Sequence, residues 1–192
     1  KAAGLYKVIG AEIDDKYIAH VKAQVVNQDA IDKMQDDIKI VYTPLHGTGN
    51  IPVRRVLKEI GFTHVYVVPE QELPDGDFPT VSYPNPEAAE AFELGLALGK
   101  KVDADLILAT DPDADRLGVY AKDEKTGEYV SFTGNMSGSL IAEYILREKK
   151  EKGELPENAA IVETIVTTDM LKAVAEKYGV KLMEVLTGFK FI

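Results

Sequence analysis

The chain has 192 residues, of which 45% are hydrophobic and 28% are charged, and its formal net charge at pH 7 is −10. This composition supports a buried core, leaves room for one large or two small domains, and argues against nucleic acid or an anionic membrane as partner, because both bind basic surfaces. The absence of cysteine excludes disulfides, thiolate metal sites and cysteine nucleophiles, and it fits a reducing cytoplasm.

The first residues show no membrane or export signal. No apolar run approaches the ~18 residues of a membrane span, and "KAAGLYKVIG" does not resemble a signal peptide. The sequence opens without methionine and ends at "TGFKFI", within an apolar pattern, so we expect it to be a piece of a longer protein. Residues 1–36 are polar and partly helical and are expected to form a lead-in linker and a helix.

Three short apolar runs follow, at Ile38–Tyr42, His64–Val68 and Asp105–Thr110, and each is typical of a buried strand. Helical patterns over residues 50–61 and 86–101 separate them. In the first helix Pro52 falls in the first turn and Gly61 stops the pattern. An order of strand, helix, strand, helix, strand predicts parallel pairing in an α/β layer structure.

The segment "RLGVYA" reads as a further strand. Only a tight loop joins it to the run before it, which requires antiparallel pairing, so we expect it to be an edge strand on an otherwise parallel sheet. A polar turn follows, and near Phe132 the pattern restarts as helix, strand, helix, strand. The fold class is therefore α/β, with two consecutive α/β units whose mixed, mostly parallel sheets are flanked by helices. The expected domains cover residues 37–131 and 132–192.

Two loops lack an obvious structural role. The stretch Pro69–Glu87 contains five prolines and is too broken for regular structure, and ordered loops of this length are usually functional. We expect it to cross the surface near a site or to pack on a neighbouring domain. The loop "PLHGTG" after the first strand lacks the Gly-Lys-Ser/Thr of a phosphate-binding P-loop. His46 within it is interpreted first as a loop or interdomain residue and second as a site residue.

The strongest chemical signal is "ILATDPDADRLGV", where an apolar strand leads into three aspartates at alternate positions. Alternate side chains of an extended segment share a face, so Asp111, Asp113 and Asp115 can converge on one point. Converging carboxylates repel unless a cation neutralises them, and hard oxygen ligands suit Mg²⁺, Mn²⁺ or Ca²⁺. The loop also leaves the carboxyl end of a parallel strand, where open α/β sheets bind their ligands.

Other interpretations explain this loop less well. A solvated acidic turn would explain a lone "DPD", since Asp and Pro are ordinary turn residues. An EF-hand would need glycine and glutamate where Arg116 and Lys122 stand, so it is rejected. A haloacid-dehalogenase-type phosphatase resembles the loop in its first two aspartates but places Thr or Val where Asp115 stands.

"TDPDADRLG" resembles the metal-binding loop of the α-D-phosphohexomutases, the phosphoglucomutase and phosphomannomutase superfamily. Further stretches of the chain are similar to other motifs of this superfamily, in the same order, and together they cover nearly the whole sequence. These stretches are "VYTPLHGTGN", "PDGDFPTVSYPNPE", "TGNMSGSLIAEYIL" and "VLTGFKFI". The resemblance implies that the chain spans the second domain of such an enzyme and the N-terminal part of its third domain.

The resemblance also implies a reaction and a set of site residues. Superfamily members interconvert hexose 1-phosphates and 6-phosphates through a phosphoserine and a bisphosphorylated sugar, with glucose 1,6-bisphosphate as the activating intermediate. Carried over, Asp111, Asp113 and Asp115 are the Mg²⁺ ligands, and Arg116 and Lys190 bind the sugar phosphate substrate. Arg116 also has a simpler interpretation as an ion-pair partner of its own aspartates, and Lys190 as a solvated lysine.

Two superfamily parts have no counterpart in the 192 residues. There is no "TASHNP"-like serine segment and no sugar-recognition loop after "TGFK", so we expect the first and fourth domains to lie elsewhere in the parent chain and this piece alone to be inactive. Three alternatives stay open. They are a phosphopentomutase of the same superfamily, a non-catalytic module that binds a metal or sugar phosphate, and a dehalogenase-type phosphatase.

Overall fold

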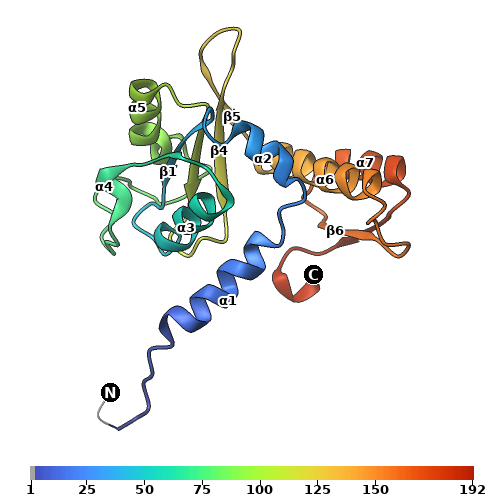
Figure 1. The fold of residues 1–192 in the computed structure, drawn as a ribbon, viewed down its shortest axis with the longest axis horizontal. Helices are drawn as coiled ribbons and strands as arrows, with labels where there is room; N and C mark the ends of the chain where they lie inside the picture. The colour runs from blue at the N-terminus through green and yellow to red at the C-terminus, as the bar shows by residue number, and fades with distance from the viewer. Residues whose placement is uncertain (1–2) are drawn as a thin grey trace. The chain divides into compact units, whose positions relative to one another are not determined.

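The structure is a computed structural model that describes residues 3–192 (Figure 1). Two helices precede the first strand, in the segment expected to hold a lead-in linker and helix. They are α1 (Gly10–Lys22) and α2 (Gln28–Met34). Helix α2 begins where the side chain of Asn27 accepts a hydrogen bond from the backbone N–H of Ala30, at 3.1 Å. This is a regular N-cap, in which a side-chain oxygen satisfies one of the free amides of the first turn.

The larger sheet has five strands in the order β2-β1-β3-β4-β5. The strands are β1 (Lys39–Thr43), β2 (His64–Val67), β3 (Leu106–Thr110), β4 (Leu117–Lys122) and β5 (Tyr129–Phe132). Strand β1 pairs in parallel with β2 and with β3, and β4 pairs antiparallel with β5. The mixed, mostly parallel character expected from the sequence is confirmed.

The expected position of "RLGVYA" at the sheet edge is wrong. Strand β4, which contains most of this segment, lies between β3 and β5, and β5 forms the edge. No strand was predicted from the sequence at the short segment "YVSF", which follows a polar turn. In the structure this segment pairs antiparallel with β4, with Val119 opposite Phe132 and Lys122 opposite Tyr129. An edge strand of only four residues is a common way to end a sheet.

The connections between the parallel strands place the helices. They are α3 (Asn50–Ile60), the single turn α4 (Pro69–Glu72), the 3₁₀ turn η1 (Ala89–Phe92) and α5 (Glu93–Val102). From β1 the chain crosses to β2 on one side and then to β3 on the other. Right-handed crossovers in opposite directions put α3 and α5 on opposite faces of the sheet, as Figure 1 shows.

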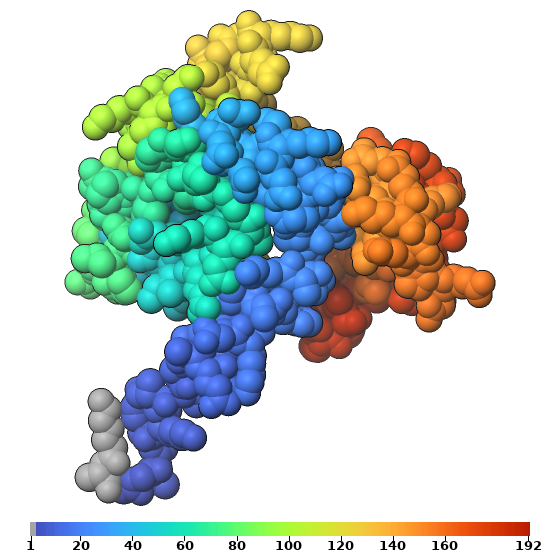
Figure 2. Space-filling model, viewed as in Figure 1, coloured from blue at the N-terminus to red at the C-terminus, as the bar shows by residue number. Residues whose placement is uncertain are grey.

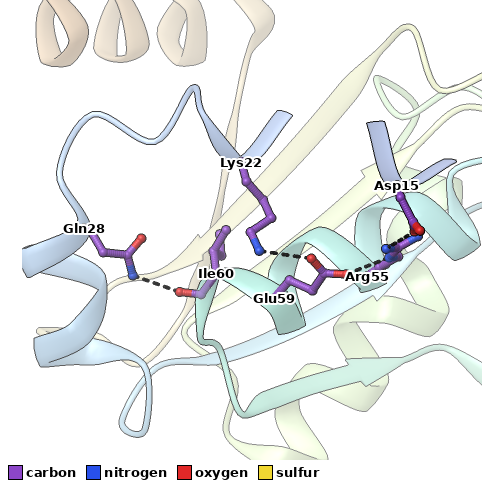
Figure 3. Close-up of polar contacts among 6 residues, drawn as sticks. All are labelled: Asp15, Lys22, Gln28, Arg55, Glu59 and Ile60. Carbon is purple, nitrogen blue, oxygen red and sulfur yellow. Dashed lines mark hydrogen bonds and ion pairs between the residues drawn. The ribbon is translucent and has the colours of Figure 1, made fainter. Parts of the chain in front are cut away.

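Helix α3 joins the N-terminal segment to this sheet. Ile18 of α1 is 2% exposed, and the blue N-terminal segment lies against the teal surface of α3 in Figure 2. Figure 3 shows the polar contacts beside it, where Arg55 of α3 binds both Asp15 at 2.6 Å and Glu59 at 2.7 Å, and Lys22 binds Glu59 at 3.0 Å. All of these charged groups are partly exposed, so the buried isoleucine, rather than the ion pairs, supplies most of the packing energy.

The C-terminal part of the chain forms a smaller helix–strand unit. Its elements are α6 (Gly134–Glu151), β6 (Ala160–Thr164), α7 (Met170–Tyr178), β7 (Lys181–Val185) and the 3₁₀ turn η2 (Phe189–Phe191). Strands β6 and β7 pair in parallel, and α6 packs on α7 around a core formed by Leu146, Val174 and Tyr178. The predicted helix, strand, helix, strand order is confirmed.

One buried carboxylate of this unit stands out. Glu163 on β6 is 7% exposed, and no hydrogen-bond partner of its Oε2 is found in the described part of the chain. Its neighbour across the β6–β7 pair is Glu184. Burial is the main cause that raises the pKa of Glu163, and the charges of Glu184 and Asp169 add to it.

The chain divides into two compact units, one that ends at Leu117 and one that begins at Gly118. The division falls at the start of β4. Among residues 3–192 no helix has the length and apolar content that crossing a membrane requires.

Candidate metal centre

The three aspartates lie on a loop that joins β3 to β4. Asp111 directly follows the last residue of β3, and a turn closes with a hydrogen bond of 3.0 Å from the Ala114 N–H to the Asp111 carbonyl. Ala114 has a φ of +60°, a left-handed conformation that few non-glycine residues adopt. The loop contains no helix, as the sequence predicts.

The side chains of this loop converge. One oxygen from each of Asp111, Asp113 and Asp115 lies within 4.8 Å of the others, and no other such group of three acidic or histidine ligands occurs among residues 3–192. The Asp111 carboxylate is fully buried, whereas the other two are exposed. The loop therefore anchors one carboxylate in the protein and offers two to solvent.

Arg116 holds the buried carboxylate from two directions. Its backbone N–H donates to Asp111 Oδ1 at 2.9 Å, and its Nε donates to Asp111 Oδ2 at 2.6 Å. The same Nε lies 3.6 Å from Asp115. The ion pair that the sequence left open as the simpler role of Arg116 is thus present, while its side chain remains 46% exposed.

The charged groups of the loop shift one another's pKa values. Burial alone would raise the pKa of Asp111, but the backbone and side-chain hydrogen bonds from Arg116 outweigh it and hold the pKa below its usual range. The pKa of Asp115 is raised, mainly by its hydrogen bond with Asp111 and then by the charge of Asp113. Because Arg116 pairs with only two of the three carboxylates, Asp111 and Asp115, the loop keeps excess negative charge that a cation would neutralise.

A second loop, the turn after β1, packs against the aspartate loop. The turn after β1 places Thr48 beside the aspartate loop, where its N–H and its hydroxyl both donate to the Pro112 carbonyl, at 2.8 and 3.1 Å. A Cβ on Gly47 would lie 2.4 Å from Pro112 Cα, and one on Gly49 would lie 2.5 Å from the Tyr42 hydroxyl. The two glycines of "HGTG" are therefore needed for close approach.

The contact between these two loops was not predicted from the sequence, although the strand order points to it. Strands β1 and β3 are neighbours, and the chain continues from β1 to β2 on one side of this pair and from β3 to β4 on the other side. The carboxyl ends of such a strand pair form the switch point at which open α/β sheets bind ligands. The two loops that follow these strands, residues 44–49 and 111–116, meet at that point.

The remaining predicted site residues take separate positions. His46 is buried, 6% exposed, and binds the proline-rich loop. That loop also comes near the aspartate loop, because Tyr83 is among the groups that raise the pKa of Arg116, after Asp111. Lys190 lies in η2 of the second unit, with its Nζ 5.0 Å from the ring centre of Phe191. Its role in substrate binding stays a prediction.

The donor set fits a hard divalent cation. Carboxylate oxygens are the ligands that Mg²⁺ and Ca²⁺ prefer, and there is no thiolate anywhere in the sequence to favour a softer metal. Two exposed carboxylates beside a buried one leave room for water and for a ligand from a substrate, as Mg²⁺ sites require.

Comparisons with known protein families give consistent matches along the chain. The model for phosphoglucomutase/phosphomannomutase, alpha/beta/alpha domain II, matches residues 15–127, and the model for alpha/beta/alpha domain III matches residues 133–192. These two matches leave only short segments unassigned.

Two curated relatives illustrate the similarity. A phosphoglucomutase from Staphylococcus epidermidis is 37% identical over 185 residues, which cover 96% of this chain and 32% of the relative. A phosphoribomutase from Saccharomyces cerevisiae is 40% identical over 159 residues, which cover 79% of this chain and 26% of the relative. The chain thus spans about a third or less of the length of these relatives.

Solved structures share the fold. A phosphoglucomutase/phosphomannomutase family protein from Burkholderia thailandensis has a TM-score of 0.66 at 23% identity, over 92% of this chain and 33% of its own. An N-acetylphosphoglucosamine mutase from Aspergillus fumigatus, solved in complex with GlcNAc-6P and magnesium, has a TM-score of 0.54 at 15% identity, over 88% of this chain and 36% of its own.

Proposed function

The chain belongs to the phosphoglucomutase/phosphomannomutase family, and on that premise we propose that it is the metal-binding central part of an enzyme that interconverts hexose 1-phosphate and hexose 6-phosphate. The convergence of three carboxylates at the switch point of the larger sheet carries this proposal. In this part Asp111, Asp113 and Asp115 hold Mg²⁺, in line with the magnesium complex of the Aspergillus mutase. When bound, Mg²⁺ would neutralise charge on the oxygens of a transferring phosphoryl group.

The protein's own groups have distinct tasks in this proposal. Asp111 is fixed by Arg116 and defines where the cation sits, and the two exposed aspartates complete its protein ligands. The guanidinium of Arg116 is planar and half-exposed, so it can also donate to a substrate phosphate beside the carboxylates. Lys190 is proposed to bind the same phosphate-bearing substrate.

The proposal extends to the organisation of the parent protein. We assign residues 37–131 to the second domain of the family and residues 132–192 to the N-terminal part of the third, after a lead-in linker and helix at residues 1–36. The phosphoserine that carries the phosphoryl group, and a fourth domain, are assigned to other parts of the parent chain. Such an enzyme works on soluble metabolites, which favours a cytoplasmic location.

A pentose phosphate is the second candidate substrate. The yeast relative that is 40% identical to this chain is a phosphoribomutase, an identity slightly above that of the staphylococcal phosphoglucomutase. Assays of the full-length parent with glucose 1-phosphate, mannose 1-phosphate and ribose 1-phosphate decide between these substrates by the ratio of kcat/KM values.

Magnesium titration tests the proposed metal site directly. Mg²⁺ is added to the isotope-labelled 192-residue chain, and amide NMR shifts of the aspartate loop give the dissociation constant. The comparison is a triple variant with Asp111→Asn, Asp113→Asn and Asp115→Asn, which keeps the side-chain shapes but removes the charges. We expect saturable shifts in the wild type and none in the variant. Equal binding by the two chains would remove the loop from the metal site and contradict the proposal.

Turnover supplies an independent check on the assignment of the carrier serine. The 192-residue chain, supplied with Mg²⁺, glucose 1-phosphate and glucose 1,6-bisphosphate, is expected to show no mutase activity, because the sequence holds no "TASHNP"-like segment to carry the phosphoryl group between half-reactions. Turnover by a preparation free of host mutase would show that a carrier exists within these residues.

A further inference from the structure

A buried polar network joins the proline-rich loop to the turn after β1. The Thr43 hydroxyl lies 2.7 Å from Gln71 Oε1, and Gln71 Nε2 lies 3.2 Å from the Thr80 hydroxyl. The same Thr80 oxygen lies 2.9 Å from His46 Nε2, and His46 Nδ1 lies 3.1 Å from the Leu73 carbonyl. Thr43 and Gln71 are fully buried, so the bond between them is formed away from water, and the other three bonds are partly buried.

Each bond in this network has one direction when the His46 ring carries a single proton. A carbonyl can only accept, so His46 Nδ1 carries a proton and donates to Leu73. In the neutral ring Nε2 then accepts, and the Thr80 hydroxyl is its donor. The Thr80 oxygen accepts in turn from the amide of Gln71, whose Oε1 accepts from Thr43. The network is fully satisfied by a neutral histidine in its Nδ1–H form.

His46 lies in a segment of backbone with an unfavourable conformation. Leu45 and His46 have φ values of +46° and +60°, two successive non-glycine residues in the left-handed region. Such a conformation is unfavourable for a residue with a Cβ and persists only where its surroundings fix it. Here the Leu45 N–H donates to the Thr43 hydroxyl at 3.1 Å, and the His46 N–H donates to the Gln71 carbonyl at 2.9 Å.

The strained turn bears directly on the aspartate loop. The residues that follow His46 are Gly47, whose Cα has no room for a Cβ against Pro112, and Thr48, which donates twice to the Pro112 carbonyl. Pro112 stands between Asp111 and Asp113 in the chain. A shift of the turn would therefore move the backbone that sets the spacing of these two carboxylates.

We propose that His46 is a positioning residue for the metal centre, which acts through the turn at residues 44–48 to fix the spacing of Asp111 and Asp113. The inference rests on the proposed function. Mg²⁺ requires near-ideal octahedral geometry at about 2.0–2.1 Å, whereas Ca²⁺ accepts longer and less regular coordination. Loss of positioning therefore weakens Mg²⁺ binding more than Ca²⁺ binding, and a general loss of structure does not produce this selectivity.

Four single variants of the 192-residue chain test the proposal. His46→Ala removes both ring contacts, and His46→Asn keeps a donor near the Nδ1 position and tolerates the left-handed backbone. Thr80→Val removes the hydroxyl that donates to Nε2, and Thr80→Ser keeps it as the matched control. Amide NMR titrations with Mg²⁺ and separately with Ca²⁺ give both dissociation constants for each chain.

The expected result is graded. The Mg²⁺ dissociation constant rises about tenfold in His46→Ala, the lower end of the effect of losing a group that hydrogen-bonds a metal ligand, since His46 acts on the ligands only through the turn. The Mg²⁺ dissociation constant rises by a smaller factor in Thr80→Val and by a still smaller factor in His46→Asn. In Thr80→Ser it stays near the wild-type value. The Ca²⁺ constants change less in every variant. Nitrogen-15 shifts of the wild-type imidazole should also show a protonated Nδ1 and an unprotonated Nε2.

Several outcomes would overturn the positioning role. Unchanged Mg²⁺ affinity in Thr80→Val and His46→Asn is one, and an equal loss of Mg²⁺ and Ca²⁺ affinity is another. An Nε2–H tautomer in the wild type also contradicts it. The triple aspartate variant separates this failure from a failure of the proposed function. If that variant loses Mg²⁺ while the His46 and Thr80 variants keep it, only the positioning role falls.

Discussion

Two buried carboxylates in this chain have opposite surroundings. Asp111 is fully buried after β3, receives two hydrogen bonds from Arg116, and has its pKa lowered. Glu163 on β6 is almost as buried, faces Glu184 across the strand pair, and has its pKa raised. Burial disfavours charge in both places, so the difference comes from the donors nearby. A buried carboxylate with dedicated donors is kept charged, which is what a cation site needs.

The largest expected effect tests whether the charges around Asp111 serve a cation. In the full-length parent, Asp113→Asn should lower kcat on the order of 100-fold or more, a loss of about 3 kcal/mol of transition-state stabilisation. The free energy of unfolding should change by less than about 1 kcal/mol, because the exposed asparagine relieves carboxylate repulsion. Steady-state kinetics and urea unfolding measure the two quantities. Comparable losses in both would mean that the residue is structural.

Arg116→Ala makes the surroundings of Asp111 more like those of Glu163. The buried carboxylate loses its side-chain donor and keeps only the backbone N–H of residue 116. We expect the free energy of unfolding at pH 7 to fall by about 1–3 kcal/mol, the cost of a buried charged acceptor left without a donor, and nearer the lower end because the arginine is half exposed.

The pH dependence of this loss has a definite sign. The lowered folded pKa of Asp111 gives stability that is present above its ordinary value of 3.8 and is lost as the pH falls through the folded pKa. Arg116→Ala should therefore differ most from the wild type at neutral pH and least in acid. Urea unfolding between about pH 3 and pH 7 measures this, and a difference that grows toward acid would contradict the assignment.

Glu163→Gln removes the unfavourable charge from the second region. The variant should be more stable than the wild type by about 1 kcal/mol at neutral pH, since the buried Glu163 Oε2 lacks a donor and the amide supplies one beside Glu184. A raised folded pKa means that stability falls as the pH rises from 4.5 through the folded pKa, so the gain should vanish below 4.5. The matched control Glu184→Gln should give a smaller gain. A Glu163→Gln chain that is less stable at every pH would show that the carboxylate has an unrecognised partner.

The smallest effect is expected at the surface ion pairs that join α1 to α3. Arg55→Ala removes two carboxylate contacts, with Asp15 and Glu59, yet all three groups are partly exposed. The loss of stability should be below that of Arg116→Ala and should disappear in about 1 M NaCl, where the Debye length is about 3 Å. A loss that persists at this salt concentration would indicate packing by the arginine stem rather than charge.

The sequence predicted what local patterns encode. The parallel strands β1, β2 and β3 follow from short apolar runs, and the convergence of the aspartates follows from their alternation along one extended loop. Both are properties of residues that are close together in the chain, so one sequence suffices to recognise them.

Contacts between residues that are far apart in the sequence could not be predicted from local patterns. Gly47 and Pro112 are far apart in the sequence, and only the fold shows that they touch. The same holds for His46, whose partners lie in the proline-rich loop. The edge strand β5 was missed because the cross-strand register with β4, rather than its own weak pattern, makes it a strand.

The close approach of Gly47 to Pro112 has a consequence for inherited variation in genes that encode this segment. Every missense change at a glycine adds a Cβ, and here that atom would lie 2.4 Å from Pro112 Cα, inside any real contact distance. All missense alleles at this codon should therefore displace the aspartate loop, whatever residue they introduce. Under the proposed function these alleles weaken Mg²⁺ binding, and a higher Mg²⁺ concentration restores part of it, although the codons of Asp111, Asp113 and Asp115 are unchanged.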